Sequence, residues 1–273
     1  MEYVWPCLFA VFVWWFGTAL VFMLDQLPRH TYRRTMWGAT LMLGAALLCV
    51  VTLSESTTMA SAYAGFACGV LVWAWQEIAF LTGVVTGPNR APLAEGTEGF
   101  PRFRAALSAI IHNELAMIAL GLVLLALLWD APNQMALWTY LALWVMRQSA
   151  KINIFLGARN LGEAMLPPHL AHLASYFRRR PMNWLFPFSV TGGTVGVVLL
   201  ALAAVQADDP YLVTAYTLLA ALLALAVIEH WFLMLPLPLD GLWTWGRPAS
   251  AAPPEPPPLH PQRSDPASLP LRP

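Results

Sequence analysis

The chain has 273 residues, of which 58% are hydrophobic and only 11% charged, and its 15 basic and 15 acidic residues give a formal net charge of zero. The mean hydropathy is +0.58. Since soluble domains have about 25% charged residues, this composition excludes an ordinary soluble globular protein and indicates a membrane protein.

Seven apolar stretches are long enough to cross a bilayer, because about 20 residues at a rise of 1.5 Å cover roughly 30 Å of hydrocarbon. We interpret them as helices, since lipid offers the backbone no hydrogen-bond partner and the alternation expected of a barrel strand is absent. In chain order they are Tyr3–Leu24, Met36–Leu53, Ala60–Val85, Ala105–Leu128, Met135–Leu156, Trp184–Val205 and Leu212–Leu235. The sequence therefore predicts an all-α polytopic membrane protein, in which residues 1–245 form a bundle of seven transmembrane helices.

The connections between these stretches alternate in charge. Arginines follow the first, third, fifth and seventh stretches, whereas the segments 54–59, 129–134 and 206–211 contain no Lys or Arg. The positive-inside rule then places the N-terminus outside and the C-terminus in the cytoplasm. An odd number of spans is required by this arrangement, and seven spans satisfy it.

The composition changes after Trp245. Residues 246–273 are dominated by Pro, Ala and Ser, and five of the six residues from Pro253 to Pro258 are prolines. A segment of this kind cannot bury enough apolar surface to fold. We therefore predict a disordered cytoplasmic tail, and we exclude its His260 from any site.

Polar residues inside the apolar stretches are informative, because a charge near the bilayer centre costs from about 2.5 to more than 10 kcal/mol. They occur in four stretches, all in the half next to the arginine-bearing connections. These residues are Gln76 and Glu77, His112, Asn113 and Glu114, Arg147, Gln148, Lys151 and Asn153, and Glu229 and His230. For Arg147 and Lys151, snorkelling to the membrane surface or pairing with Glu77 is an alternative explanation that needs no function.

The third arginine-bearing connection, residues 157–183, is the longest loop. It contains Arg159, Asn160 and Glu163, followed by a segment that predicts a short interfacial helix with a proline at its first position. The i,i+3 spacing places His169 and His172 on one face of that helix. We expect the helix to cap the polar residues of the bundle.

Two imidazoles and several carboxylates suggest a metal site, because iron and other divalent metals accept both nitrogen and oxygen ligands. The hypothetical ligands are Glu77, His112, Glu114, Glu163, His169, His172, Glu229 and His230. The spacing is not diagnostic, since no Glu-x-x-His pair occurs and adjacent Glu229 and His230 diverge by about 100° on a helix. The alternatives are a ligand for the central metal of a pigment, or a polar network that holds the helices together and includes Gln76, Arg147, Gln148, Lys151, Asn153, Arg159 and Asn160.

Five segments resemble a known family. They are 75–83 (WQEIAFLTG), 143–153 (LWVMRQSAKIN), 166–170 (LPPHL), 175–183 (SYFRRRPMN) and 229–238 (EHWFLMLPLP). In these segments the chain resembles the PuhE-type photosynthetic complex assembly proteins of purple phototrophic bacteria. The resemblance runs from about Trp14 to Trp245, and it assigns no catalytic residue.

The resemblance implies a multi-pass protein of the bacterial inner membrane, cytoplasmic or intracytoplasmic. Its function would be to support reaction-centre assembly and bacteriochlorophyll biosynthesis or handling, with transient binding of a tetrapyrrole. The alternative is a membrane metalloenzyme, such as a di-iron-like oxidoreductase acting on a magnesium tetrapyrrole. The expected partners are membrane lipids and either photosynthetic complex subunits or pigment-biosynthesis enzymes, and we expect no nucleic acid.

Overall fold

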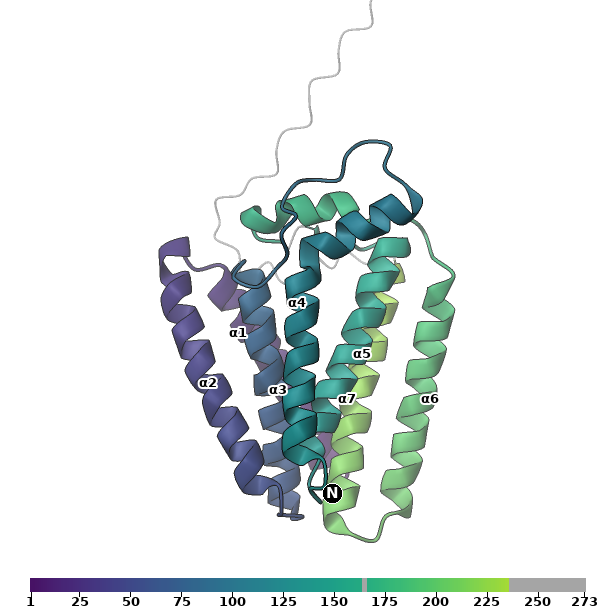
Figure 1. The fold of residues 1–273 in the computed structure, drawn as a ribbon. Helices are drawn as coiled ribbons and strands as arrows, with labels where there is room; N and C mark the ends of the chain where they lie inside the picture. The colour runs from purple at the N-terminus through teal and green to yellow at the C-terminus, as the bar shows by residue number, and fades with distance from the viewer. Residues whose placement is uncertain (164–165, 236–273) are drawn as a thin grey trace, which may run out of the picture.

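The computed structural model describes residues 1–163 and 166–235, in which the regular secondary structure is helical throughout. Figure 1 shows the long helices lying side by side in a bundle. The elements are α1 (Val4–Asp25), η1 (Arg29–Thr31), α2 (Tyr32–Leu53), α3 (Met59–Leu81), α4 (Gly99–Leu128), α5 (Met135–Leu156), η3 (Pro168–Tyr176), α6 (Leu185–Gln206) and α7 (Pro210–Met234). The predicted tail, residues 246–273, lies outside the described residues.

The all-α membrane architecture is confirmed. Among the described residues, six helices are long and apolar enough to cross a membrane, namely α1, α2, α3, α4, α6 and α7. The remaining long helix, α5, has the length of a span with 22 residues, but it contains Arg147 and Lys151. It nevertheless packs between the other helices, against α3, α4, α6 and α7.

Local sequence signals explain where two of these helices begin. Thr58 and Ser61 form a reciprocal capping box at the start of α3, in which each side chain accepts a hydrogen bond from the backbone of the other residue. Asp209 accepts a hydrogen bond from the Tyr211 backbone at 2.8 Å, and Pro210 occupies the first turn of α7. Both caps satisfy backbone donors that a helix start would otherwise leave unpaired.

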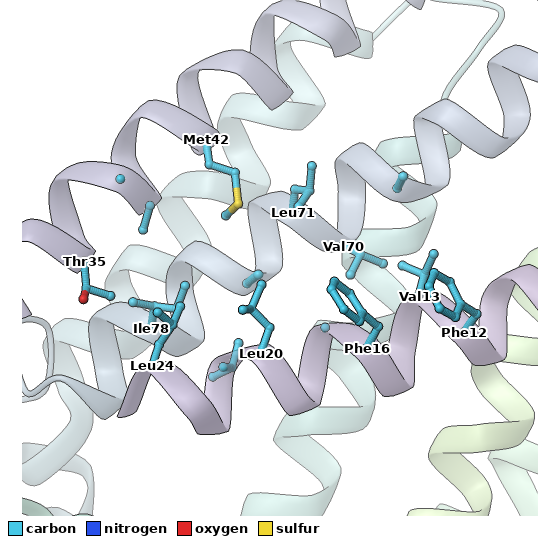
Figure 2. Close-up of a pocket in the computed structure, with 16 residues that line it drawn as sticks. Phe12, Val13, Phe16, Leu20, Leu24, Thr35, Met42, Val70, Leu71 and Ile78 are labelled. Carbon is cyan, nitrogen blue, oxygen red and sulfur yellow. The ribbon is translucent and has the colours of Figure 1, made fainter. Parts of the chain in front are cut away.

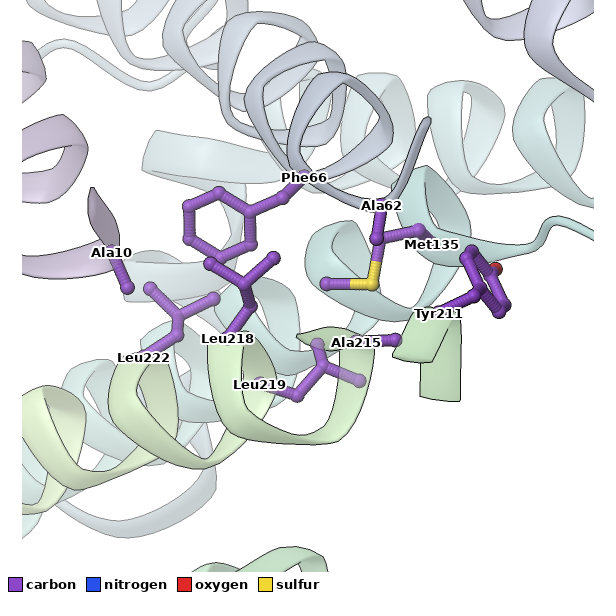
Figure 3. Close-up of a cluster of buried hydrophobic side chains, with 9 residues drawn as sticks. All are labelled: Ala10, Ala62, Phe66, Met135, Tyr211, Ala215, Leu218, Leu219 and Leu222. Atoms are coloured by element: carbon purple, nitrogen blue, oxygen red, sulfur yellow. The ribbon is translucent and has the colours of Figure 1, made fainter. Parts of the chain in front are cut away.

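The helices α3, α5 and α7 form the centre of the bundle, and α1, α2, α4 and α6 pack around them. About half of the α3 and α7 spans is buried, compared with 11% for α1 and α6. Figure 3 shows one core cluster, where Ala10 of α1, Phe66 of α3, Met135 of α5 and Leu218 of α7 meet. The outer helices therefore present apolar side chains to the lipid, as expected where lipid is the solvent.

The connection from α3 to α4 is tied into a bend of α4. In Figure 1, the first turns of α4 run across the end of the bundle before the helix turns along it. The Asn113 backbone N–H donates to the Thr86 carbonyl at 2.9 Å, so the loop interrupts the helical ladder at that point. At Gly87 the loop backbone comes very close to the α4 backbone, because a Cβ there would lie 2.2 Å from the Ser108 carbonyl oxygen.

A short helix occurs in the loop 157–183 where the sequence predicts one, with Pro168 in its first turn, and it has 3-10 geometry. Buried Arg102 of α4 holds this loop, since its Nη2 donates to the carbonyls of Phe155 at 2.9 Å and Tyr176 at 2.7 Å. The Arg102 guanidinium also lies 3.9 Å from the centre of the Phe155 ring. One side chain therefore joins α4, the end of α5 and η3.

Candidate functional site

Polar side chains of five helices meet inside the bundle, in the half next to the arginine-bearing loops. We call this group the polar layer. It consists of Gln76 and Glu77 of α3, Asn113 and Glu114 of α4, Arg147, Gln148, Ser149, Lys151 and Asn153 of α5, Ser189 of α6, and His230 of α7. Eight of these residues were predicted from the sequence, either as part of a polar network or as metal ligands, and each makes a hydrogen bond or ion pair to another helix of the layer.

Glu114 has a complete set of partners on α5. Lys151 Nζ donates to Glu114 Oε1 at 2.7 Å, and Gln148 Nε2 donates to Glu114 Oε2 at 2.6 Å. The side chains of Lys151 and Glu114 are only 19% and 15% exposed. Both carboxylate oxygens are thus engaged, so that the charge at this depth is compensated by the neighbouring helix.

Glu77 and Arg147 form a second, looser ion pair between α3 and α5. A single contact of 3.2 Å joins Arg147 Nη2 to Glu77 Oε2, rather than the two parallel bonds that a guanidinium can make. Arg147 Nε is buried without a hydrogen-bond partner, although the side chain as a whole is 38% exposed. The predicted pairing with Glu77 therefore occurs for Arg147, whereas Lys151 pairs with Glu114.

Gln76 lies beside this pair and is fully buried. Its Nε2 donates to Asn113 Oδ1 at 2.7 Å and to the Asn113 carbonyl at 3.2 Å. Its Oε1 is buried without a partner. The two amides connect α3 to α4 at the bend where the Asn113 backbone turns to the Thr86 carbonyl.

His230 of α7 begins a chain of hydrogen bonds to α5 and α6. Its Nδ1 lies 2.8 Å from the Ala226 carbonyl and must donate, because a carbonyl only accepts. Its Nε2 lies 2.9 Å from Ser149 Oγ, which lies 2.8 Å from Ser189 Oγ. Asn153 Nδ2 donates to Ser189 Oγ at 3.0 Å.

This chain is consistent with two protonation states of His230. In the neutral state, the Ser149 hydroxyl donates to Nε2. In the charged state, Nε2 donates to Ser149 Oγ, the Ser149 hydroxyl turns to Ser189, and the Ser189 hydroxyl can donate to the Leu185 carbonyl at 3.2 Å. The two states keep the same hydrogen-bond partners and differ only in the orientations of the two hydroxyl groups.

The family match decides the identity of the chain. A family model described as "Protein of unknown function (DUF3623)" matches residues 1–254. The chain belongs to this family.

A relative in Rhodobacter capsulatus is 36% identical over 253 residues, which cover 90% of this chain and 91% of the relative. Its printed name is "Uncharacterized 30.4 kDa protein in puhA 5'region". The resemblance to PuhE-type proteins is thereby confirmed. No solved structure matches the chain.

The residues of the hypothetical metal site do not gather in one place. Residues 1–163 and 166–235 hold no group of three His, Cys, Asp or Glu side chains that could bind one metal ion. Glu77 and Glu114 contact separate cations, and His230 contacts Ser149. The geometry of the described chain therefore gives the metal hypothesis no support.

Of the other hypothetical ligands, His169 and His172 are neighbours on η3, while His112, Glu229 and Glu163 have separate surroundings. His112 is exposed on α4, and Glu229 is exposed on α7 without an ion pair among the described residues. Glu163 lies in the loop and contacts Arg179. His169 Nε2 donates to the Leu81 carbonyl at 2.8 Å, so it caps the end of α3.

The histidines of η3 are partly buried. Burial lowers the pKa of His169, and the neighbouring Arg29, Arg90 and His172 lower it further, against the hydrogen bond to Leu81. Burial also lowers the pKa of His172. Both imidazoles are thus held towards the neutral form.

The last two predicted polar residues connect the loop to the end of α7. Asn160 Nδ2 donates to the carbonyls of Phe232 at 2.6 Å and Leu235 at 2.7 Å. The Arg159 backbone N–H donates to the Leu233 carbonyl at 3.0 Å. These contacts satisfy carbonyls that the helix end leaves unpaired.

Two asparagines that the sequence analysis did not select have central roles. Asn183 donates to Asn153 and to the Gly157 carbonyl and accepts from the backbone of Leu185 and Phe186. Asn133 donates to carbonyls of Leu53 and Ser56 and accepts from the Tyr211 hydroxyl at 3.0 Å. Their position two residues before a helix is the available signal, because asparagine is favoured at helix starts.

Proposed function

We propose that this protein is an integral factor of the bacterial inner membrane that supports assembly of the photosynthetic reaction centre and the supply or handling of bacteriochlorophyll. The observation that carries the proposal is the 36% identity, over nearly the whole chain, to a protein named for its place in the puhA 5′ region. The partners would be photosynthetic complex subunits or pigment-biosynthesis enzymes, together with membrane lipids.

The polar layer supports a role as a scaffold. Its charges pair between helices, with Glu77 on Arg147 and Glu114 on Lys151, and its amides and hydroxyls connect α3, α4, α5, α6 and α7. Buried polar groups that satisfy one another fix the relative positions of helices. A rigid bundle with an apolar outer surface suits a protein that presents a constant face to other membrane subunits.

The proposal includes seven spans, with the N-terminus outside and the C-terminus in the cytoplasm. Although α5 is less apolar than the other long helices, its charged residues pair with Glu77 and Glu114 and so do not require water. A reporter fused after Trp245 is expected to be cytoplasmic, and a reporter inserted near Asp130 is expected to be periplasmic. A periplasmic signal at the C-terminal fusion would contradict seven spans.

The functional test is deletion of the gene in a phototroph. Phototrophic growth is expected to slow, because fewer reaction centres would be assembled, while respiratory growth in the dark is expected to stay unchanged. A plasmid copy of the gene serves as the control and is expected to restore phototrophic growth. Equal phototrophic growth of the deletion and parent strains would refute the proposal.

A further inference from the structure

A groove of about 440 Å³ lies between α1 and α2, with α3 as its floor. Figure 2 shows Phe16 and Leu20 of α1, Met42 of α2 and Leu71 of α3 around it. Its lining is apolar except for Thr35. The volume is in the range of about 300–1,000 Å³ that is usual for small-molecule sites.

Two glycines keep the groove open without serving contacts inside the chain. A Cβ at Gly38 would have no heavy atom within 4 Å, and a Cβ at Gly17 would only touch Val70 at 4.0 Å. Since neither glycine is needed for close packing of this chain, the space beside them is available to another molecule.

The length of the groove fits one leaflet of the membrane. On α1 it extends from Phe12 to Leu24, which is about 18 Å at 1.5 Å per residue, or roughly half of a 30 Å hydrocarbon core. Beyond Phe12 the space is closed, because Phe9 packs on Tyr63 with ring centres 4.9 Å apart and on Phe66 at 6.1 Å. A partner helix crosses both leaflets, whereas a hydrocarbon tail occupies only one.

A carboxyl group without a partner lies one residue beyond Leu24, the last residue of α1 that lines the groove. Asp25 continues the stripe of α1 that Gly17 and Val21 form at intervals of four residues. The residue is only 8% exposed, its side chain has no hydrogen bond or ion pair among the described residues, and its Oδ1 is buried without a partner. A buried carboxyl group in that state is destabilising unless a donor or cation reaches it.

The charges around Asp25 indicate which other charged group the ligand carries beside its donor. Arg29 follows on η1, and Arg33 and Arg34 lie in the first turn of α2, all exposed and without an ion pair to Asp25. This end of the groove therefore offers one acceptor carboxyl group together with exposed guanidinium groups. A phospholipid head that carries both an ammonium and a phosphate matches this pair of opposite charges.

We propose that the groove binds one phospholipid of the phosphatidylethanolamine type, with a hydrocarbon tail between α1 and α2, its ammonium on Asp25 and its phosphate near the arginines. The lipid would fill the space between two helices that each pack on α3. The proposal does not depend on the role in photosynthesis proposed above.

The test uses the full chain in vesicles of equal amounts of phosphatidylethanolamine and phosphatidylglycerol, extracted in mild detergent and analysed by native mass spectrometry. One phosphatidylethanolamine per chain is expected to stay bound. Gly38→Leu places a side chain in the groove and is expected to reduce the retained lipid by about tenfold or more. The matched control is Gly44→Leu, the same change on α2 at a glycine that also has nothing within 4 Å but does not line the groove.

The head group is tested with Asp25→Asn, which keeps the shape but removes the negative charge. This variant is expected to retain the two lipids about equally, because the ammonium loses its partner. Three results would overturn the proposal: no lipid retained by the natural chain, equal retention of both lipids by the natural chain, or the same loss in Gly38→Leu and Gly44→Leu. A bacteriochlorophyll or a partner helix found in place of the lipid after isolation from native membranes would also overturn it.

Discussion

At the scale of single residues, the carboxyl groups at membrane depth differ in how fully they are compensated. Glu114 has a cation on one oxygen and an amide on the other, Glu77 has one contact of 3.2 Å, and Glu229 has no ion pair among the described residues. Neutralising Glu114 should therefore reduce the stability of the fold most, Glu77 less and Glu229 least, because a cation left unpaired inside the bundle is costly.

Replacing Glu114 with Gln is therefore expected to destabilise the bundle by about 3 kcal/mol, since Lys151 would be left without its anion. Unfolding of the purified protein in mixed micelles measures this effect. Lys151→Met alone is expected to be destabilising as well, and the double variant is expected to be more stable than the sum of the two changes predicts. Glu229→Gln is the control at similar depth, with a much smaller effect. Additive single and double changes would contradict a direct interaction between Glu114 and Lys151.

Substitution of Gly87 is expected to be as destabilising as substitution of a buried side chain, because its neighbours are backbone atoms, which cannot change rotamer to make room. A Cβ would lie 2.2 Å from the Ser108 carbonyl oxygen and 2.5 Å from the Ala109 carbonyl carbon. Gly87→Ala is expected to separate the loop from α4 and lower the unfolding temperature in micelles. In Gly192→Ala, the control, the new methyl meets no atom within 4 Å, so the temperature should stay equal or rise slightly. An unchanged temperature for Gly87→Ala would contradict the close contact.

At the scale of elements, the sequence predicts the spans better than the loops. The first stretch differs from α1 by one residue at each end, and the fifth coincides with α5. By contrast, α4 begins at Gly99 rather than Ala105, because buried Arg102 finds the carbonyls of Phe155 and Tyr176 as partners. A hydropathy profile counts Arg102 as a polar residue that ends the apolar stretch, because it does not include hydrogen bonds to residues far away in the sequence.

The sequence predicts how deep in the membrane each residue of the polar layer lies, but not towards which neighbouring helix its side chain points. Residue spacing places Glu77, His112, Glu114 and His230 in one half of the bundle, but the rotation of each helix about its axis decides which of them meet. His112 is on the outside of α4, while Glu114 turns to α5. The metal hypothesis rested on shared depth, and shared depth does not bring ligands together.

The cap that η3 provides at the end of α3 is expected to depend on pH. The pKa of His169 is lowered in the folded protein, so the unfolded chain binds more protons below its ordinary value of about 6.5. The cap is then stable above that pH and weakens as the pH falls through it. The protection of residues 168–176 against hydrogen exchange, relative to the intrinsic exchange rate at each pH, is expected to be lower at pH 5 than at pH 7.5, about the pH range over which a histidine titrates.

The control for this measurement is His169→Gln, which keeps a side-chain donor for the Leu81 carbonyl but does not titrate. Because His172 also has a lowered pKa, a residual pH effect in this variant would report on His172. The same loss of protection in the natural protein and the double variant His169→Gln/His172→Gln would contradict the cap as its source.

At the scale of the whole molecule, the fold has a paired polar interior and a broad apolar exterior. An ion pair joins the central helices α3 and α5, and the hydrogen bond between His230 and Ser149 joins α7 to α5. The outer helices expose large side chains such as Leu41, Trp37 and Phe188. Such a molecule is constructed to hold its shape in lipid and to meet other membrane components on its outside. This agrees with a supporting role in the assembly of a larger membrane complex.

The most direct test of that role is the bacteriochlorophyll absorbance of membranes, per amount of membrane protein, from parent, deletion and complemented strains. All three are grown at low oxygen in the dark, so that growth does not depend on photosynthesis. The account predicts lower near-infrared absorbance and fewer reaction centres in the deletion strain, with recovery in the complemented strain. Equal absorbance and reaction-centre content in the parent and deletion strains would contradict it.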